Sequence, residues 1–410
     1  MTNSTQQPAN QQRFDEVYTF LHEHRALWEE EVLTRYPQSL DAFPEDWIEV
    51  LARLSLEELF ALERHRSYKL VDSPSLLDFF ERSDQLATIN HIRLPEEPAF
   101  PAEAFQGVSA KKQHEILRLA AALETVIASG SVSSISDYGG GIGYLAQALG
   151  HLYALPIRSL DRDQALQEKG RHRQAGLRSV RAASVRYVHC DLTDAIPDEP
   201  KGSLCLGLHT CGSLAPLLLQ AALEQQHACL LNFGCCYYKT EPRHLHLSER
   251  AKGRRLNLTA PALTLASRSH KESKDAFLLS KRVKRFRYTL HLFLYHELGQ
   301  KHFVSVGNSP RELYRGDFAP YAVEQLQRLG FPAPDKRTLE QFFSTRAIEQ
   351  QVWRMTIANI IRFQAGRLLE LYVLFDRALL LEEAGLRVTV AEYFDQRISP
   401  RNVGISAERG

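Results

Sequence analysis

The stretch that decides the fold runs from Ser134 to Leu149 and has the sequence SISDYGGGIGYLAQAL. A short strand-like segment (134–138) enters a glycine turn, and a helix with periodic apolar residues follows the turn. Glycines at such a junction allow a tight turn and let a ligand lie against main-chain N–H groups at the start of the helix. The stretch therefore predicts the first strand, turn and helix of a ligand-binding α/β unit.

Strand and helix patterns continue to alternate after this stretch. Parallel strands joined by crossover helices form a sheet that is covered by helices. The pattern therefore predicts an α/β fold with a seven-stranded, mostly parallel sheet and an antiparallel last strand. The expected strands are 134–138, 156–161, 184–191, 204–209, 229–234, 386–395 and 402–407, with one extra strand at 302–307, and the expected helices include 110–129, 163–176 and 214–225.

The chain has 410 residues, which is more than one hydrophobic core usually organises. We expect an N-terminal helical unit and linker over 1–108 and the first part of the sheet core over 109–239. A helical, partly basic insertion over 240–385 interrupts the sheet, and residues 386–410 supply its last two strands.

Composition excludes several protein classes. With 44% apolar and 24% charged residues, the chain is neither disordered nor collagen-like nor a coiled coil. We predict no membrane span and, from the polar start, no signal peptide. All six cysteines lie between Cys190 and Cys236, which favours a reducing, cytoplasmic setting over a disulfide scaffold.

The glycine turn and two following acids predict a cofactor site. NAD, FAD and S-adenosylmethionine all suit this geometry. An acid that opens the turn can hold the cationic amino group of a methionine moiety, and the dinucleotide motif would require glycine at Tyr144, so S-adenosylmethionine is favoured. Acids that end the second and third strands can accept hydrogen bonds from ribose hydroxyls and from the adenine amino group. The predicted cofactor-binding residues of this motif are Asp137, Gly139, Gly141, Gly143, Asp161 and Asp191.

Two lysines, Lys111 and Lys112, open the helix that precedes the first strand. Positive charge at a helix N-terminus opposes the macrodipole, so the pair suggests an anion nearby. We include Lys112 among the residues that contact the cofactor carboxylate, while a solvated first turn explains the pair equally well.

Histidine, cysteine and tyrosine follow the fourth and fifth strands, as His209-Thr210-Cys211-Gly212 and Cys235-Cys236-Tyr237-Tyr238. Ligands of open α/β sheets lie beyond the carboxyl ends of the strands, so these segments are expected to face the transferred methyl group. The predicted catalytic residues are His209, Cys235, Cys236 and Tyr237.

Three chemistries fit these residues. His209 and Tyr237 could position and deprotonate an acceptor hydroxyl or amine. A cysteine could attack a pyrimidine ring with His209 as base, although no acidic partner for the histidine is evident. His209, Cys211 and one or both vicinal cysteines could bind zinc, which is not favoured because adjacent cysteines ligate one ion awkwardly. The competing interpretation is that the cysteines are small buried hydrophobic residues and that His209 belongs to the core.

Positive charge is concentrated in residues 239–301, which contain 15 Lys/Arg and 5 Asp/Glu. The segments KGRRLN (252–257) and KRVKRFRY (281–288) lie within it. Cations interleaved with Phe286 and Tyr288 could hold phosphates and stack bases, so this segment is the predicted RNA-binding region. A solvated helix face is the alternative.

These motifs resemble a family of methyltransferase-like proteins described as ribosomal RNA adenine dimethylase domain-containing. The similar pieces are AKKQHE (110–115), DYGGGIG (137–143), GLHTCGSLAP (207–216), GCCYYK (234–239), LFDRALLLEEAG (374–385) and YFDQRISPRN (393–402). The resemblance implies a Rossmann-like class I methyltransferase fold and the cofactor S-adenosylmethionine. The two strand-end motifs are also loosely similar to those of tRNA ribose 2′-O-methyltransferases, which implies RNA as the acceptor.

The sequence thus predicts an S-adenosylmethionine-dependent methyltransferase that acts in RNA modification. The alternatives are a methyltransferase-fold binding module with weak or no activity, and a protein methyltransferase. The acceptor atom and the oligomeric state are not predicted.

Overall fold

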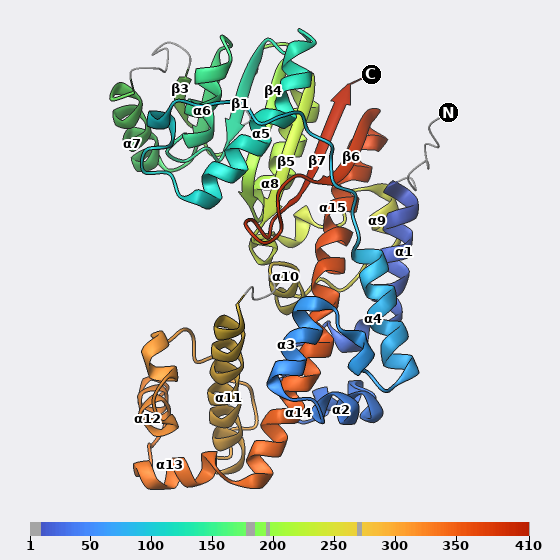
Figure 1. Ribbon diagram of the computed structural model, residues 1–410, viewed down its shortest axis with the longest axis vertical. Coiled ribbons are helices and arrows are strands. Elements are labelled where there is room, and N and C mark those ends of the chain that lie inside the picture. The colour runs from blue at the N-terminus through green and yellow to red at the C-terminus, as the bar shows by residue number, and fades with distance from the viewer. Residues whose placement is uncertain (1–9, 178–184, 194–196, 269–272, 410) are drawn as a thin grey trace. The chain divides into compact units, whose positions relative to one another are not determined.

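The structure is a computed structural model, and it describes residues 10–177, 185–193, 197–268 and 273–409 (Figure 1). The chain divides into two compact units. The sheet unit comprises Met1–Thr19, Leu86–Leu256 and Leu369–Gly410, and the helical unit comprises Phe20–Gln85 and Asn257–Leu368.

One seven-stranded sheet forms the centre of the sheet unit (Figure 1). Its strand order is β3-β2-β1-β4-β5-β7-β6. Strands β1 to β5 are parallel, and β7 is antiparallel to both neighbours. This order, with a reversed strand near one edge, confirms the predicted Rossmann-like class I fold. The strands are β1 Ser134–Tyr138, β2 Ile157–Asp161, β3 Val185–His189, β4 Ser203–Cys211, β5 Cys229–Cys235, β6 Leu386–Glu392 and β7 Val403–Arg409.

The helix before β1 and the helices between the following strands pack on the sheet. They are α5 Ala110–Ala128, α6 Tyr144–Leu152, α7 Gln164–Ala175 and α8 Leu214–Glu224. Ser109 caps α5 by accepting a hydrogen bond from the Lys112 amide, and Asp163 caps α7 in the same way from Leu166. The core between helices and strands is apolar, because β1, β4 and β5 are buried along almost their whole length. Its members include Leu119, Leu123, Ile135, Leu145, Leu206, Leu231 and Phe233.

Further helices of the sheet unit come from both ends and from the middle of the chain. They are α9 Glu249–Gly253 and most of α1 Asn10–Glu23 and α15 Ala365–Glu383. Asp376 of α15 accepts hydrogen bonds from the amides of Leu247 and Ser248 at the start of α9. The buried carboxylate of Asp376 thus holds the N-terminus of α9, and with it the segment after β5, against α15.

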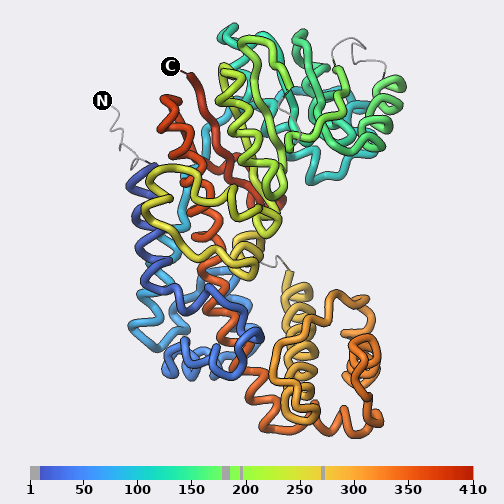
Figure 2. The backbone as a smooth tube through the Cα atoms, turned by 180° about the vertical axis from the view of Figure 1, so that it is seen from behind, coloured from blue at the N-terminus to red at the C-terminus, as the bar shows by residue number. Residues whose placement is uncertain are grey.

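The helical unit is assembled from two segments that are far apart in the sequence. Figures 1 and 2 both show the blue N-terminal helices beside the orange-red α14. Trp353 of α14 donates its indole N–H to the carbonyl oxygen of Ala52 at the end of α2. The helices are α2 Glu45–Ala52, α3 Leu56–His65, α4 Pro74–Ala87, α10 Ala260–Ala266, α11 Lys274–His296, α12 Phe318–Arg328, α13 Lys336–Phe343 and α14 Arg346–Phe363.

The units divide the chain differently from the predicted boundaries. Residues 20–85 and 257–368 were expected to belong to two separate units, but they form one. Short amphipathic helices such as α2 and α3 bury little apolar surface by themselves. They are therefore stable only when they pack on other helices. Their partners are α11 and α14 of the predicted insertion.

The strands predicted for the sheet are present, with ends that agree within three residues. The extra strand at 302–307 is wrong, because this segment has no strand assignment and none of its residues is buried. A strand needs a neighbouring strand to satisfy its backbone groups, and the described residues offer none there. Among the same residues, no helix combines the length and the apolar run that crossing a bilayer requires.

Candidate functional site

The glycine turn after β1 packs tightly against side chains at the ends of β1 and β2. Gly139, Gly141 and Gly143 have φ values of +73°, +57° and +78°, which favour glycine. A Cβ atom added to Gly140 would lie 2.4 Å from Ser159 Oγ and 2.8 Å from Asp137 Oδ2. The turn therefore passes directly over the side chains at the ends of β1 and β2.

Four main-chain amides of this turn donate hydrogen bonds within the sheet unit. The amides of Gly139 and Gly140 donate to the carbonyl oxygen of Leu160, and that of Gly143 donates to Gly140. The Gly141 amide donates to Asp161 Oδ2 at 2.8 Å. The turn uses these four amides to hold its own shape, and ligand binding at the turn stays a prediction. The glycines provide space for close approach.

Asp137, at the carboxyl end of β1, is the most unusual carboxylate of the site. Its side chain is buried, and within the described residues its Oδ2 atom has no hydrogen-bond partner. Burial raises its pKa to about 7, the nearby Lys112 lowers it, and Asp161 raises it further. A buried oxygen without a donor suits a cationic group of a ligand, so Asp137 fits the amino group of S-adenosylmethionine.

Asp161 ends β2 beside the turn. Its Oδ2 accepts the Gly141 amide, and its Oδ1 accepts the Asp163 amide at 2.8 Å. Each carboxylate oxygen can accept a second hydrogen bond, so the side chain is held in place and can still bind hydroxyl groups. This geometry fits a ribose.

Asp191 follows β3 and is partly exposed. Its Oδ1 accepts the amide and the hydroxyl of Thr193, and these hydrogen bonds lower its pKa. It is therefore an ionised acceptor at a third strand end, where the sequence predicts the contact with the adenine amino group.

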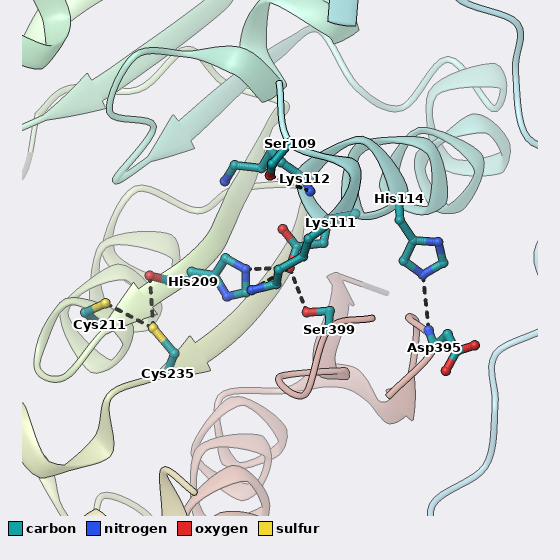
Figure 3. A network of polar contacts seen from close by, with 10 residues as sticks. Ser109, Lys111, Lys112, His114, His209, Cys211, Cys235, Asp395 and Ser399 are labelled. Carbon is teal, nitrogen blue, oxygen red and sulfur yellow. Dashed lines mark hydrogen bonds and ion pairs between the residues drawn. The ribbon is translucent and has the colours of Figure 1, made fainter. Parts of the chain in front are cut away.

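His209 lies beside a buried glutamate (Figure 3). The ladder between β4 and β5 shifts register between Gly207 and Thr210, and His209 has a φ of +59° there. The irregular backbone breaks the side-chain alternation of the strand. His209 Nε2 then lies 2.7 Å from Oε1 of Glu115, which comes from α5.

Glu115 is fixed by three groups. Besides His209, Ser399 donates to its Oε1 at 2.7 Å, and Lys111 Nζ lies 3.3 Å from the same atom. Burial would raise the pKa of the carboxyl, but the hydrogen bonds from His209 and Ser399 and the positive charges nearby lower it to about 2. Glu115 is therefore a buried carboxylate that orients the imidazole, and Nδ1 is the ring nitrogen that can accept a proton from a substrate.

The expectation that His209 has no acidic partner is thus wrong. Glu115 and Ser399 were missed, although they lie in the motifs AKKQHE and YFDQRISPRN, and the anion beside Lys111 is Glu115. Periodicity assigned Glu115 to a helix but could not tell that the helix presents it to a strand end 94 residues later. The same two motifs meet again where the Asp395 amide donates to His114 Nε2 (Figure 3).

Three cysteine sulfurs gather next to His209. Cys211 and Cys235 face each other in the ladder, with their Sγ atoms 3.0 Å apart, and Cys235 Sγ donates to the His209 carbonyl oxygen. The sulfurs of Cys211, Cys235 and Cys236 all lie within 4.8 Å of one another. The hydrogen bond between the two thiol groups lowers the pKa of Cys211 to about 6 and raises the pKa of Cys235.

Tyr237 is buried and is not accessible to a substrate beside His209 and the cysteines. Its ring is buried, and its hydroxyl group donates to Glu370 at 3.2 Å and to Gly234 O at 3.3 Å. Burial raises its pKa strongly. A direct role of the hydroxyl group on an acceptor does not fit this burial, so Tyr237 packs the end of β5 against α15.

The predicted basic segment is divided between the two units, and its aromatic residues are internal. Phe286 and Tyr288 are buried, and the Tyr288 hydroxyl group accepts from Asn359. The prediction that these rings stack bases is therefore wrong, because the amphipathic helix α11 turns them into the core of the helical unit.

Cations of the same helix line a cavity of about 1080 Å³ in the helical unit. Lys281 pairs there with Glu63, whereas no carboxylate of the described residues lies within ion-pair distance of Lys284. Burial and the charges of Lys281 and Arg268 lower the Lys284 pKa well below its ordinary value. The charged lining residues are Arg268, Lys281, Lys284, Arg287, Arg311, Glu31 and Glu63. The cavity thus has an excess of positive charge.

Comparison with known proteins gives one domain match and several distant structural similarities. Residues 111–243 match a family model described as a methyltransferase domain. Similar solved structures include geranyl diphosphate C-methyltransferase from Streptomyces coelicolor A3(2), at 13% identity over 51% of this chain and 94% of that chain, with a TM-score of 0.24. Coclaurine N-methyltransferase is 11% identical over 96% of this chain and 98% of that chain, with a TM-score of 0.27. Such low TM-scores carry no information about the acceptor. The strand order shows the Rossmann-like class I fold, and residues 111–243 within it match a methyltransferase domain.

Proposed function

We propose that the protein is an S-adenosylmethionine-dependent methyltransferase whose acceptor is RNA. The methyltransferase domain supports the reaction class, and the cationic cavity of the helical unit is the observation that supports RNA. The resemblance to RNA-modifying methyltransferases agrees with this acceptor. The clustered cysteines, none of which forms a disulfide, favour a cytoplasmic setting.

The strand ends β1 to β3 fit the cofactor. Asp137 has an unpartnered buried oxygen for an ammonium group, and Asp161 presents a fixed carboxylate for ribose hydroxyls. Lys112 is close enough to Asp137 to lower its pKa, and its charge suits the cofactor carboxylate. S-adenosylmethionine supplies an electrophilic methyl group on its sulfonium.

The pair of Glu115 and His209 supplies a general base. With Nε2 hydrogen-bonded to Glu115, the imidazole accepts the proton of an acceptor hydroxyl or amino group at Nδ1. Glu115 stabilises the imidazolium that results, because its low pKa keeps it ionised at neutral pH. A side chain about 21% exposed can reach a substrate while its partner stays 1% exposed. Holding the acceptor in line with the methyl group supplies the remaining acceleration.

The helical unit offers the contacts for a phosphate backbone. Lys284 and Arg311 line the cavity, and neither makes an ion pair with a described carboxylate. Phosphate oxygens would provide the missing negative charge around Lys284 and restore its ordinary pKa. RNA is favoured over a protein acceptor because these cations line one cavity, where they can contact the phosphates of an RNA backbone.

The experiment is methyl transfer from tritiated S-adenosylmethionine to total RNA and total protein of cells that lack this chain. We expect label in RNA, and no label with Asp161→Ala, which removes the ribose contact. The double variant Lys284→Gln/Arg311→Gln should lose about tenfold in RNA affinity at moderate salt, with a smaller salt slope. The matched control Lys336→Gln, an exposed lysine outside the cavity, should bind RNA like the wild type.

Each other outcome contradicts part of the proposal. Label in protein alone would identify a protein methyltransferase. Absence of label in both pools, together with no heat from S-adenosylmethionine in calorimetry, would identify a binding module. RNA labelling that is unchanged in the double variant would remove the cavity from RNA recognition.

A further inference from the structure

The cysteine cluster at the ends of β4 and β5 has no part in the proposed proton transfer. Cys211 is exposed, Cys236 is partly exposed and Cys235 is buried. Their sulfurs lie within 4.8 Å of one another, although only two of the three residues are adjacent in the sequence. Such a convergence needs a cause other than core packing, because small buried hydrophobic residues do not require their sulfur atoms to meet.

The backbone explains how adjacent cysteines can face one point. Consecutive side chains of an extended strand point to opposite sides. Cys236 follows the last residue of β5 with φ +48° and ψ +45°, a left-handed conformation that breaks this alternation. A residue other than glycine adopts it only where its surroundings enforce it. The objection that adjacent cysteines ligate one ion awkwardly therefore does not apply here.

The two strand ends are also held together independently of the sulfurs. The Gly212 amide donates to the Cys235 carbonyl oxygen at 3.0 Å, and Cys211 and Cys235 are direct neighbours in the parallel ladder. Three thiol groups are thus presented by a rigid frame. A zinc site in tetrahedral geometry has S–S separations of about 3.8 Å, given Zn–S bonds of about 2.3 Å. The 3.0 Å between the sulfurs of Cys211 and Cys235 and the 4.8 Å limit on the other pairs lie on either side of this value.

We propose that Cys211, Cys235 and Cys236 bind one Zn²⁺ ion and leave its fourth coordination position open. Three thiolate sulfurs suit zinc better than magnesium, calcium or manganese, which prefer oxygen ligands. His209 is not the fourth ligand through Nε2, because that atom is hydrogen-bonded to Glu115. The exposed side of Cys211 leaves the fourth position to water or to a donor atom of a substrate.

Metal analysis tests this site without any activity assay. The full chain is purified without a metal-binding tag, and zinc is measured by mass spectrometry before and after incubation with Zn²⁺ and gel filtration. We expect about one equivalent of zinc in the wild type. Cys211→Ser and Cys235→Ser should lose nearly all of it, whereas the matched control Cys190→Ser, a partly exposed cysteine outside the cluster, should keep it. Circular dichroism checks that each variant is folded.

Cobalt gives a second measurement that does not depend on the serine variants. Co²⁺ added to the metal-free wild type should produce the intense thiolate-to-cobalt absorption of a sulfur-rich site, and Zn²⁺ should abolish it. The proposal fails if the wild type holds less than about a tenth of an equivalent after incubation with Zn²⁺. It also fails if the two cluster variants keep their zinc, or if the reduced protein shows no cobalt–thiolate absorption.

Discussion

At the scale of single residues, the chemistry of the site depends on one buried carboxylate. Glu115 is 1% exposed and joins groups from α5, from the end of β4 and from the loop before β7. An imidazole that is held at Nε2 has a defined tautomer and orientation, so its other nitrogen is presented as a base. The proposed role of His209 is therefore inseparable from Glu115.

Glu115→Gln should lower kcat strongly. The amide keeps the shape of the side chain but cannot stabilise an imidazolium, and we expect a loss of about 10²-fold or more. Affinity for S-adenosylmethionine should change by less than about twofold, because Glu115 is not among the predicted cofactor contacts and the substitution keeps the shape of its side chain. Steady-state kinetics and calorimetry measure the two quantities. Glu124→Gln, an exposed glutamate of the same helix, is the matched control.

A parallel loss of cofactor affinity in Glu115→Gln would contradict the base role, because it would show a general disturbance of the domain. An unchanged kcat would show that His209 does not take the proton.

Asp137 should make cofactor binding depend on pH. Burial raises its pKa to about 7 from the usual 3.8, so the folded protein holds a proton there that the unfolded chain has lost. The contribution of Asp137 to the free energy of unfolding is therefore greatest below the pKa of 3.8 in the unfolded chain. It falls as the pH rises from there to about 7 and is constant at higher pH. Because an ammonium ligand favours the ionised carboxylate, S-adenosylmethionine affinity should rise about tenfold per pH unit from about pH 5.5 and level off near pH 7.

Calorimetry across this range measures the slope, and Asp137→Asn should bind weakly with no such dependence. Wild-type affinity that is constant between about pH 5.5 and pH 7 would show that Asp137 does not meet the ammonium group.

At the scale of elements, the turn between β1 and α6 is shaped by what lies under it. Its amides are used internally, and its glycines make room for Ser159, Asp137 and Leu214. The turn therefore packs closely over the ends of two strands. This close packing explains why glycine is needed at successive positions.

Gly140→Ala should destabilise this element. The added methyl group would lie 2.4 Å from Ser159 Oγ and 2.8 Å from Asp137 Oδ2, so the turn or Asp137 must move. Overpacking of this kind costs about 1–3 kcal/mol of unfolding free energy and should weaken S-adenosylmethionine binding more than tenfold. Urea denaturation and calorimetry provide the measurements.

Gly176→Ala is the matched control, because its added methyl group would meet only one carbonyl oxygen at 3.4 Å and its φ is −86°. If both variants lose the same stability, the effect belongs to glycine replacement in general and not to the packing under the turn.

At the scale of the whole molecule, both units are built from segments that are distant in the sequence. The sheet is completed by residues after 386, and the helical unit joins 20–85 to 257–368. Within the helical unit, Arg362 of α14 is 3% exposed and donates to the carbonyl oxygens of Glu30, Trp28 and Pro261. One side chain thus connects three parts of that unit, and burial lowers its pKa to about 10.

Arg362→Ala should unfold the helical unit more easily. The substitution leaves three carbonyl groups in a poorly hydrated site without their donor, which we expect to cost about 2–4 kcal/mol. Urea denaturation followed by circular dichroism measures the loss, and the exposed Arg346→Ala at the start of the same helix is the control. Equal stability of the two variants would show that residues 20–85 do not depend on this connection.

The sequence by itself determined the strands of the sheet, their mostly parallel direction and the glycine turn after the first strand, because these features follow from local periodicity and from one turn motif. Asp137, Asp161 and the glycines lie within 30 residues of one another on consecutive elements, so their proximity follows from the βαβ unit alone.

Only the tertiary structure decided the partner of His209, the meeting of Cys211 with Cys235 and Cys236, the burial of Tyr237, Phe286 and Tyr288, and the joining of the N-terminal helices to the insertion. Each of these depends on where a helix or strand end lies relative to elements about 20 to 300 residues away, and local periodicity indicates which face of an element is apolar but not what covers it.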